Sequence, residues 1–565
     1  MDILPTTLEE AHARGWDALD VVLVTGDDYI DHPSFGMAII GRFLESLHLR
    51  VGIIPRPRID VADDFRALGR PRLFFGVTAG NLDSMVSLYT AARKVRSDDP
   101  YASGGKALGR PYLPTLAYTN KLRSIFPGVA VVLGGIEASL RRVAHYDHYH
   151  GKIRPPQLLA AKADILVYGN AERPLGEIVS ELRAGKPLAS IRDVRGTAVP
   201  VNASERASIG DALVLPSYEE VAKDTDAFLT MTRLVAENGH SSAKPLYQEA
   251  AGRGVLINPP AIPLTTEELD AVYDLPFTRK PHPRYTAPIP ALAVVEHSIT
   301  AHRGCYGGCA FCSLSLHQGK TIQMRSLDSI RREVRTLFEN DHRRKVVITD
   351  IGGPTANMYG TGGKDRSACD RCRRQSCLYP SICTNLDTSH AKYGALLEAI
   401  RAMPEVKRVY VNSGIRYDLA SCDLPFISAI AEHYTQGRLS VAPEHADKDV
   451  LVRAGKPPIE SYERFANAYD AASRRHGKEQ FLVPYFIAGL PGETDEGART
   501  LARYIQKKRI RTEQVQEFYP TPMTLSTAMY YTGKDPFTGR PVAVEKRERV
   551  KRLRKNTFAN RRKHR

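Results

Sequence analysis

The segment His302-Arg303-Gly304-Cys305-Tyr306-Gly307-Gly308-Cys309-Ala310-Phe311-Cys312 decides how the chain is interpreted. Its cysteines have the spacing C-x3-C-x2-C, and the segment directly follows a predicted strand, Ala293–Ala301. Three thiolates on one loop can bind three irons of a 4Fe–4S cube and leave the fourth open, whereas clusters that only transfer electrons normally take four cysteines. The three glycines allow the backbone to fold closely around a bulky inorganic core. The expected metal ligands are Cys305, Cys309 and Cys312.

A zinc ion is the alternative occupant of the same loop. Zinc would need a fourth ligand, which His302 or His317 could supply. The spacing, the glycines and the position after a strand all agree with a cluster, so the sequence favours iron and sulfur over zinc.

Strands and helices alternate from about residue 291 onward. Helical patterns follow most of the strands, which makes six βα units over roughly 240 residues, fewer than the eight of a full barrel. We therefore predict a partial (β/α)6 barrel over residues 291–540. The predicted strands are Ala293–Ala301, Lys345–Ile351, Arg408–Ser413, Arg438–Ala442, Phe481–Ala488 and Gln514–Phe518.

An aromatic residue, Phe311, stands directly before the last cysteine of the triplet. With this motif the chain resembles the radical S-adenosylmethionine superfamily. The resemblance implies that S-adenosylmethionine chelates the open iron, and that one electron from the cluster releases a 5′-deoxyadenosyl radical. That chemistry belongs to the cofactor, while the protein positions and shields it. The resemblance also implies a reductant such as flavodoxin or ferredoxin.

Segments at the carboxyl ends of the predicted barrel strands resemble the family's contacts to S-adenosylmethionine. A Gly-Gly pair resembles the GGE segment near the methionine amino group, although a proline stands where that pattern often has an acid. A serine and an arginine after the third strand are placed for the ribose or the carboxylate, and a GLPGET segment resembles the one near adenine. The cofactor-binding residues implied are Phe311, Gly352, Gly353, Ser413, Arg416 and Gly489, and the catalytic residues stay unassigned.

Further motifs narrow the resemblance to one family. His317–Lys320, Met324–Ser326 and the stretches CDRCRRQSCLYPSIC, NPPAIPLTTEELDAVYDLP and YPTPMTLSTAMYYTG resemble the YgiQ-type family of radical S-adenosylmethionine proteins. This resemblance runs from about residue 18 to about residue 540. It implies no particular substrate.

A second group of cysteines lies in a predicted insertion into the barrel, residues 359–385. Four thiolates within fifteen residues fit either tetrahedral zinc or a second 4Fe–4S cluster, and the spacing does not decide between them. The alternative is a set of reduced or disulfide-prone thiols. The group consists of Cys369, Cys372, Cys377 and Cys383.

The N-terminal part of the chain predicts a separate domain over residues 1–205, followed by a Pro-rich connecting segment over residues 206–290. Apolar runs that alternate with helical patterns indicate a parallel sheet, and five strands favour a flavodoxin-like fold. The stretches Val132–Ser139 and Leu166–Glu172 resemble the domain that binds cobalamin in many radical S-adenosylmethionine relatives. Cobalamin itself is not expected, because the nearest stretch to the D-x-H-x-x-G signature, Asp31–Gly36, has the wrong spacing. The predicted strands are Leu19–Val24, Val51–Ile54, Arg72–Val77, Val129–Leu133 and Ala163–Val167.

Composition and charge limit the other functions that the chain can have. The chain has 565 residues and no apolar run long enough for a membrane span, and its acidic N-terminus does not resemble a signal peptide, so we expect a cytoplasmic protein. The tail, residues 541–565, is basic: from Glu545 onward it holds eleven Lys or Arg against two Glu. This tail is either a solvated terminus or an arm that binds a polyanion such as RNA, and we expect it not to fold onto the barrel. The competing functions are an RNA-binding modification factor and a non-catalytic, metal-stapled interaction protein.

Overall fold

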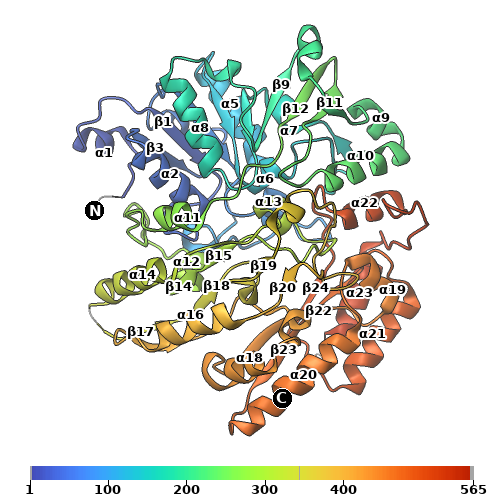
Figure 1. The fold of residues 1–565 in the computed structure, drawn as a ribbon. Helices are drawn as coiled ribbons and strands as arrows, with labels where there is room; N and C mark the ends of the chain where they lie inside the picture. The colour runs from blue at the N-terminus through green and yellow to red at the C-terminus, as the bar shows by residue number, and fades with distance from the viewer. Residues whose placement is uncertain (1–2, 108, 343, 560–565) are drawn as a thin grey trace. The chain divides into compact units, whose positions relative to one another are not determined.

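The computed structural model describes residues 3–107, 109–342 and 344–559. The chain divides into two compact units, whose helices and strands are labelled in Figure 1. The N-terminal unit runs to Leu264 and also includes Ala271–Glu296. The C-terminal unit comprises Thr265–Asp270 and the chain from His297 onward.

A largely parallel sheet forms the centre of the N-terminal unit. Its strands are β1 (Val21–Thr25), β3 (Val51–Pro55), β4 (Phe74–Thr78), β5 (Val131–Leu133), β8 (Ile165–Val167), β9 (Thr197–Val201), β10 (Leu213–Val214), β11 (Leu246–Ala250) and β12 (Arg253–Ile257). They lie in the order β10-β11-β12-β9-β8-β5-β4-β1-β3. The half from β3 to β8 is parallel throughout, and every residue of β1 is buried. Continuous burial is typical of a parallel strand covered by helices on both faces.

The sheet extends beyond the predicted N-terminal domain. Strands β10, β11 and β12 come from residues 206–290, which therefore belong to the sheet in part and are not simply a connecting segment. The β11–β12 hairpin turns at Ala251 and Gly252, whose φ angles of 52° and 72° are those of a tight primed turn. Alanine at the first turn position gives no Asn-Gly signal, and the prolines that follow masked the strands in the sequence.

Helices flank the strands of this unit. In α8 the residues Leu175, Ile178 and Val179 are buried, so one face of the helix packs inward at the spacing of i, i+3 and i+4. The helices are α1 (Leu8–Ala13), α2 (Gly36–Ser46), α3 (Ala62–Arg66), α4 (Ser84–Leu88), α5 (Pro114–Ile125), α6 (Gly135–Ser139), α7 (Gln157–Ala161), α8 (Glu172–Arg183), α9 (Tyr218–Lys223), α10 (Thr225–Glu237) and α12 (Pro290–Val295).

Parallel strands in chain order form the centre of the C-terminal unit. They are β14 (Ser298–Thr300), β17 (Val346–Ile348), β18 (Asp350–Gly352), β21 (Val406–Val409), β22 (Arg438–Glu444), β23 (Phe481–Ala488) and β24 (Gln514–Glu517). The parallel pairs are β14–β18, β17–β21, β22–β23 and β23–β24, and Ile415 bridges Val441 between the two halves. This succession of parallel strands confirms the predicted α/β class of the unit. The first strand starts later than predicted because Pro290 begins a helix.

Helices follow these strands: α14 (Leu327–Asn340), α16 (Ala391–Arg401), α18 (Leu424–Ala429), α20 (Ile459–Arg475), α21 (Asp495–Lys507), α22 (Leu525–Thr532) and α23 (Glu548–Phe558). Strand residues such as Ile348, Val409 and Leu439 share one buried cluster with helix residues such as Leu397 and Phe465. Across the described ranges, no helix is both long and apolar enough to cross a bilayer.

The basic C-terminal segment folds onto its own unit, which corrects the expectation of an unattached arm. Helix α23 contacts β23, β24 and α21. Phe558 is fully buried with Phe486 and Leu501, and Arg554 donates to Glu493 at 2.8 Å and to Asp495 at 2.6 Å. Large apolar side chains alone do not account for the stability of the docked helix, because the buried guanidinium of Arg554, with its two carboxylate partners, stabilises it further. Residues 560–565 of the predicted tail lie outside the described part.

Candidate functional site

The three cysteines of the triplet lie near one another on a loop that follows β14. Each residue is half-buried. Burial of the thiols, followed by the proximity of Cys309, raises the pKa of Cys305 and raises that of Cys312 to about 12. Thiols crowded in this way do not ionise together unless a cation is bound among them. The donor set therefore fits a metal cluster.

Two glycines of the triplet loop lie in close contact with the backbone of other segments. Gly304 has a φ of 89°, and a Cβ there would overlap the carbonyl oxygen of Thr321. Gly308 has a φ of 60°, and a Cβ there would overlap the carbonyl oxygen of Gln375. Only glycine fits such positions without displacing backbone, so the close packing that the sequence predicts around the cysteines is present.

Arg416, predicted to contact the cofactor, lies against the triplet. Its Nη1 donates to Cys309 Sγ at 3.2 Å, while Nε and Nη2 hold both oxygens of Asp418 at 2.9 and 2.6 Å. Burial opposes ionisation of Asp418, but Arg416 keeps the pKa of that carboxyl below its usual value. Asp418, two residues further on, thus fixes the guanidinium with one nitrogen aimed at a cysteine sulfur. The sequence did not point to Asp418.

The Gly-Gly pair at the end of β18 packs against two other polar residues. A Cβ at Gly352 would overlap Ser413 Oγ, and a Cβ at Gly353 would lie 2.7 Å from the His302 imidazole. Ser413 donates to Asp350 from both its backbone N–H and its hydroxyl, at 3.0 and 3.2 Å. The structure therefore brings Gly352 and Ser413 together, as a shared cofactor site requires. Phe311 is half-buried in the triplet loop.

Gly489, predicted to lie near adenine, has the C-terminal helix beside it. A Cβ at this position would come within 3.0 Å of the side chain of Lys551. Its N–H donates to Glu493 Oε2 at 3.0 Å, and Glu493 also contacts His445 Nε2 at 3.2 Å. Arg554 of α23 donates to the same carboxylate. The GLPGET segment is thus part of a buried network that reaches the C-terminal helix.

Glu444 belongs to the segment Val441–His445 at the end of the fourth predicted strand, and is a functional candidate to which the sequence assigned no role of its own. It ends β22 in the left-handed region, with a φ of 69°, and only 7% of it is exposed. Burial raises the pKa of its carboxyl, although Lys456 Nζ at 3.6 Å opposes the rise. A non-glycine residue with such backbone strain often marks a functional position. The N–H of Ala310 donates to the carbonyl of Ala454 at 2.9 Å, so the segment that carries Lys456, the partner of Glu444, contacts the triplet loop.

The second cysteine group lies between two short strands, β19 (Gly362–Gly363) and β20 (Leu386–Asp387), with Cys369 in α15 (Arg366–Asp370). Among the residues described, no three His, Cys, Asp or Glu side chains stand at the separations of a formed metal site. This is equally true of the triplet and of the second group.

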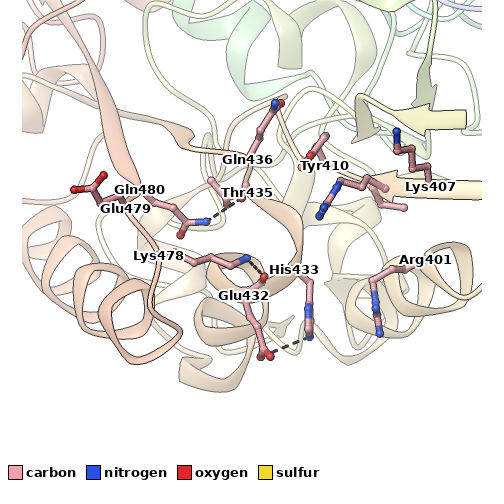
Figure 2. Close-up of a pocket in the computed structure, with 12 residues that line it drawn as sticks. Arg401, Lys407, Tyr410, Glu432, His433, Thr435, Gln436, Lys478, Glu479 and Gln480 are labelled. Atoms are coloured by element: carbon pink, nitrogen blue, oxygen red, sulfur yellow. Dashed lines mark hydrogen bonds and ion pairs between the residues drawn. The ribbon is translucent and has the colours of Figure 1, made fainter.

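A cavity of about 550 Å³ on the C-terminal unit has no cysteine of the triplet in its lining (Figure 2). Gln436 precedes β22 and Gln480 precedes β23, so the cavity lies beside the amino ends of these strands. Barrels place their active sites at the carboxyl ends, so we do not assign it to the triplet's chemistry. Its lining is Arg401, Lys407, Arg408, Val409, Tyr410, Glu432, His433, Thr435, Gln436, Lys478, Glu479 and Gln480.

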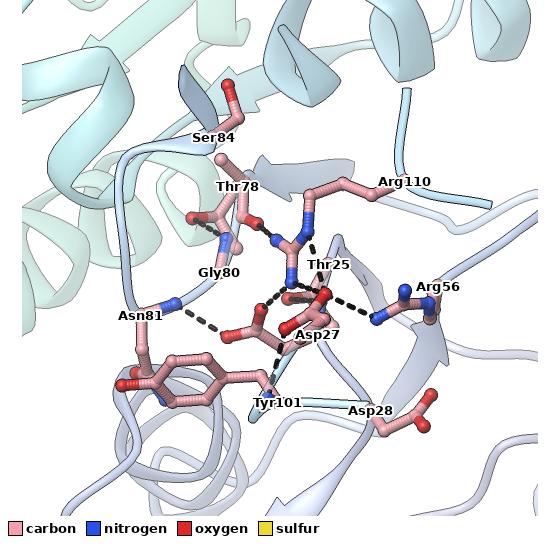
Figure 3. A network of polar contacts seen from close by, with 12 residues as sticks. Thr25, Asp27, Asp28, Arg56, Thr78, Gly80, Asn81, Ser84, Tyr101 and Arg110 are labelled. Carbon is pink, nitrogen blue, oxygen red and sulfur yellow. Dashed lines mark hydrogen bonds and ion pairs between the residues drawn. The ribbon is translucent and has the colours of Figure 1, made fainter. Parts of the chain in front are cut away.

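In the N-terminal unit, charged side chains occupy the edge of the sheet that the carboxyl ends of β1 and β4 form (Figure 3). Arg110 donates to Asp27 at 2.6 Å and to Asp99 at 2.9 Å. Arg56 donates to Asp99 at 2.9 Å, and the N–H of Asn81 donates to Asp27 at 2.6 Å. Open α/β sheets usually bind their ligands at this edge, which here is occupied by the chain's own ion pairs.

The histidine nearest to the cobalamin signature is also engaged within the N-terminal unit. His32 is fully buried, and its Nδ1 accepts a hydrogen bond from the N–H of Ser34 at 3.0 Å. Its ring packs edge-on to Phe35, with 6.0 Å between the ring centroids. The imidazole is thus held by its neighbours in the fold.

Comparison with protein families places the triplet in a known sequence context. The chain matches the Radical SAM N-terminal family over residues 3–298, the Radical SAM superfamily over 299–505 and a domain of unknown function, DUF3362, over 513–563. The last match includes α23. A radical S-adenosylmethionine domain therefore contains the cysteine triplet, as the sequence predicts, which disfavours zinc on this loop and a purely structural role for it.

Whole-chain relatives agree with this context. UPF0313 protein RPA0679 of Rhodopseudomonas palustris is 47% identical, over 98% of this chain and 84% of its own length. UPF0313 protein YgiQ of Escherichia coli is 42% identical, over 98% and 83%. The radical S-adenosylmethionine methyltransferase TsrM of Kitasatospora setae, solved with cobalamin and a [4Fe-4S] cluster, shares the fold at a TM-score of 0.50 and 15% identity, over 90% of this chain and 74% of that one. The chain belongs to the UPF0313 family, which includes YgiQ, and is an enzyme of the radical S-adenosylmethionine superfamily.

Proposed function

We propose that Cys305, Cys309 and Cys312 hold a 4Fe–4S cluster and that the chain cleaves S-adenosylmethionine reductively. When bound, the cluster supplies the one electron that splits S-adenosylmethionine into methionine and a 5′-deoxyadenosyl radical, after delivery by a donor such as flavodoxin or ferredoxin. The observation that carries this proposal is the loop of three neighbouring cysteines, packed tightly at Gly304 and Gly308 and contacted at Cys309 Sγ by Arg416. We assign no substrate.

Arg416 acts on the triplet directly. Its guanidinium donates to Cys309 Sγ, and Asp418 prevents it from turning away. A fixed positive charge beside a thiolate stabilises the anionic, metal-binding form of that thiolate. Arg416 thus positions and polarises a ligand, which modifies the expectation that it reaches the ribose or carboxylate of S-adenosylmethionine.

The other predicted cofactor residues would surround S-adenosylmethionine. Gly352 and Gly353 present backbone without side chains at the end of β18. Ser413 is oriented by Asp350. Gly489 lies at the end of β23, and Phe311 stands beside the last ligand. Their occurrence after successive parallel strands supports a common site at the carboxyl edge.

The test is anaerobic incubation of the reconstituted chain with S-adenosylmethionine and dithionite. We expect 5′-deoxyadenosine in the wild type and none in the Cys309→Ala variant, because loss of one ligand removes the cluster with the open iron. If the wild type carries a reducible cluster but yields no 5′-deoxyadenosine, the proposed function is wrong.

For the N-terminal unit we propose a flavodoxin-like scaffold that binds no cobalamin. The parallel strands, in chain order, follow the succession 2-1-3-4-5 of flavodoxin-like sheets. The ion pairs of Arg110 with Asp27 and Asp99 support a sheet edge that needs no ligand to satisfy its charges. Titration with hydroxocobalamin, followed by absorbance after gel filtration, should leave no cobalamin on the protein, and stoichiometric retention would contradict the proposal.

A second candidate function is the modification of RNA. The observation in its favour is that the docked helix α23 keeps Arg547, Arg549 and Arg552 exposed, while Arg554 anchors it. Exposed arginines along one helix can bind phosphates with strong salt dependence. Binding of transfer or ribosomal RNA should weaken in an Arg549→Glu/Arg552→Glu variant, with a shallower salt slope. If both slope and affinity stay unchanged, α23 does not bind RNA.

A further inference from the structure

The segment that carries the second cysteine group has a backbone turn between the cysteines of each neighbouring pair. Two local hydrogen bonds turn the backbone between neighbouring cysteines: the N–H of Cys372 donates to the carbonyl of Cys369 at 3.0 Å, and that of Cys383 to the carbonyl of Cys377 at 2.8 Å. Cys377 and Cys383 pack against the same buried cluster. Cys369 Sγ lies against Gly363, which pairs with Leu386, and the N–H of Leu386 donates to the carbonyl of Cys383 at 2.9 Å. These contacts join the four cysteines in one folded segment, as a single metal would require.

The surroundings of Cys369 and Cys377 suit thiolates. A Cβ at Gly363 would overlap Cys369 Sγ, so the strand β19 leaves room for that sulfur, and Asn385 Nδ2 donates to the sulfur at 3.3 Å. Lys320, in the segment that follows the triplet, donates from Nζ to the carbonyl of Arg374, between Cys372 and Cys377, at 2.7 Å. This ammonium offsets part of the charge of a four-thiolate centre.

The same segment is attached to the loop of the triplet. The N–H of Cys377 donates to the carbonyl of Tyr306 at 3.0 Å, and the hydroxyl of Ser376 donates to the carbonyl of Gly307 at 2.7 Å. Tyr306 and Leu378 share a buried cluster against which Cys305 and Cys377 pack. A movement of the second group must therefore move the backbone between the first two ligands of the triplet.

We propose that Cys369, Cys372, Cys377 and Cys383 bind a second metal centre through four thiolates, and that this centre holds the triplet loop in place. Zinc and a 4Fe–4S cluster both accept four thiolates. In either case the four thiols release their protons on binding. The metal site itself is independent of the proposed function, whereas its action on the triplet loop rests on that function.

Metal analysis of the full-length chain tests the site. The Cys305→Ala/Cys309→Ala/Cys312→Ala variant, purified anaerobically and reconstituted separately with zinc or with iron and sulfide, should retain about one zinc or about four irons per chain. Adding Cys372→Ser and Cys377→Ser should remove this metal, whereas adding Cys422→Ser, at an exposed cysteine outside both groups, should not. Electron paramagnetic resonance after reduction separates a cluster from zinc. If circular dichroism shows that the triplet variant is folded, and this variant holds neither metal, the second metal site does not exist.

The action on the triplet loop has its own readout. With the triplet intact, Cys372→Ser should lower the iron retained by the triplet at least fivefold after gel filtration, and Ser376→Ala should lower it by a smaller factor. Full retention in the Cys372→Ser variant, with the second metal absent, would overturn the coupling. A second metal in a wild type whose triplet binds no cluster would instead refute the proposed function and leave the second site standing.

Discussion

Arg416 Nη1 lies 3.2 Å from Cys309 Sγ, and Asp418 holds the remaining edge of the same guanidinium. This contact joins the loop after the first barrel strand to a residue 107 positions further along the chain. It gives the triplet a permanent positive neighbour, and it leads to a prediction about the reduction potential of the cluster.

Replacing Arg416 by Gln should lower the midpoint potential of the cluster by about 130 mV. One charge at about 5 Å, with an effective dielectric constant near 20, contributes about 3 kcal/mol, and about 59 mV corresponds to a tenfold change for one electron. A redox titration followed by electron paramagnetic resonance measures the shift. Arg401→Gln, at an exposed arginine paired with Glu398, is the control and should not shift the potential. Equal potentials in all three proteins would mean that Arg416 has no electrostatic role.

Gly308→Ala should prevent the triplet from retaining its cluster. The added Cβ overlaps the carbonyl oxygen of Gln375, and backbone must move to admit it. Gly477→Ala is a matched control, because Gly477 has a similar φ of 65° and open space around its Cβ. Both variants carry the strain of a left-handed alanine, about 1 kcal/mol. Only Gly308→Ala should lose iron, and equal iron contents in the two variants would show that the contact with Gln375 is unimportant.

The features that could be predicted from the sequence are those that depend on residues close together along the chain. The Cys305–Cys312 spacing and the strand at Phe481–Ala488 each lie within a dozen residues, and the structure has that strand with the predicted bounds. Contacts between distant residues were not visible. Asp350 with Ser413 and Arg554 with Glu493 span more than sixty residues each, and no periodicity reports which polar side chains the fold brings together. Glu444 was missed because a positive φ in a non-glycine residue leaves no mark in the sequence.

Phe558→Ala should destabilise the C-terminal unit by about 3–5 kcal/mol, the usual cost of removing a fully buried phenylalanine. Leu553→Ala, on the same helix but with 56% of the leucine exposed, should cost well under 1 kcal/mol. Urea unfolding followed by far-ultraviolet circular dichroism compares them. Similar midpoints for Phe558→Ala and wild type would mean that α23 does not dock through this side chain.

The N-terminal unit should lose stability as the pH falls below about 6.5, in part through His145. This residue lies in β6 (His145–Asp147) and is 2% exposed. Burial, followed by the charge of Arg141, lowers its pKa to about 3, while Asp147 and Asp83 oppose the shift. Between the folded and unfolded pKa values the unfolded chain binds a proton that the folded chain does not, so the free energy of unfolding rises with pH across this window.

Trp16 is the chain's sole tryptophan and belongs to the N-terminal unit, so its fluorescence follows the unfolding of that unit. From about pH 7.5 to about pH 5, one histidine with these pKa values removes about 2 kcal/mol of unfolding free energy. His145→Gln keeps an N–H that can donate to the carbonyl of Val143, the present partner of His145 Nδ1, but it cannot titrate. Over the same pH interval, the unfolding free energy of the His145→Gln variant should fall by about 2 kcal/mol less than that of the wild type. Parallel curves for the two proteins would mean that His145 is protonated as readily in the folded chain as in the unfolded one, against the burial seen in the structure.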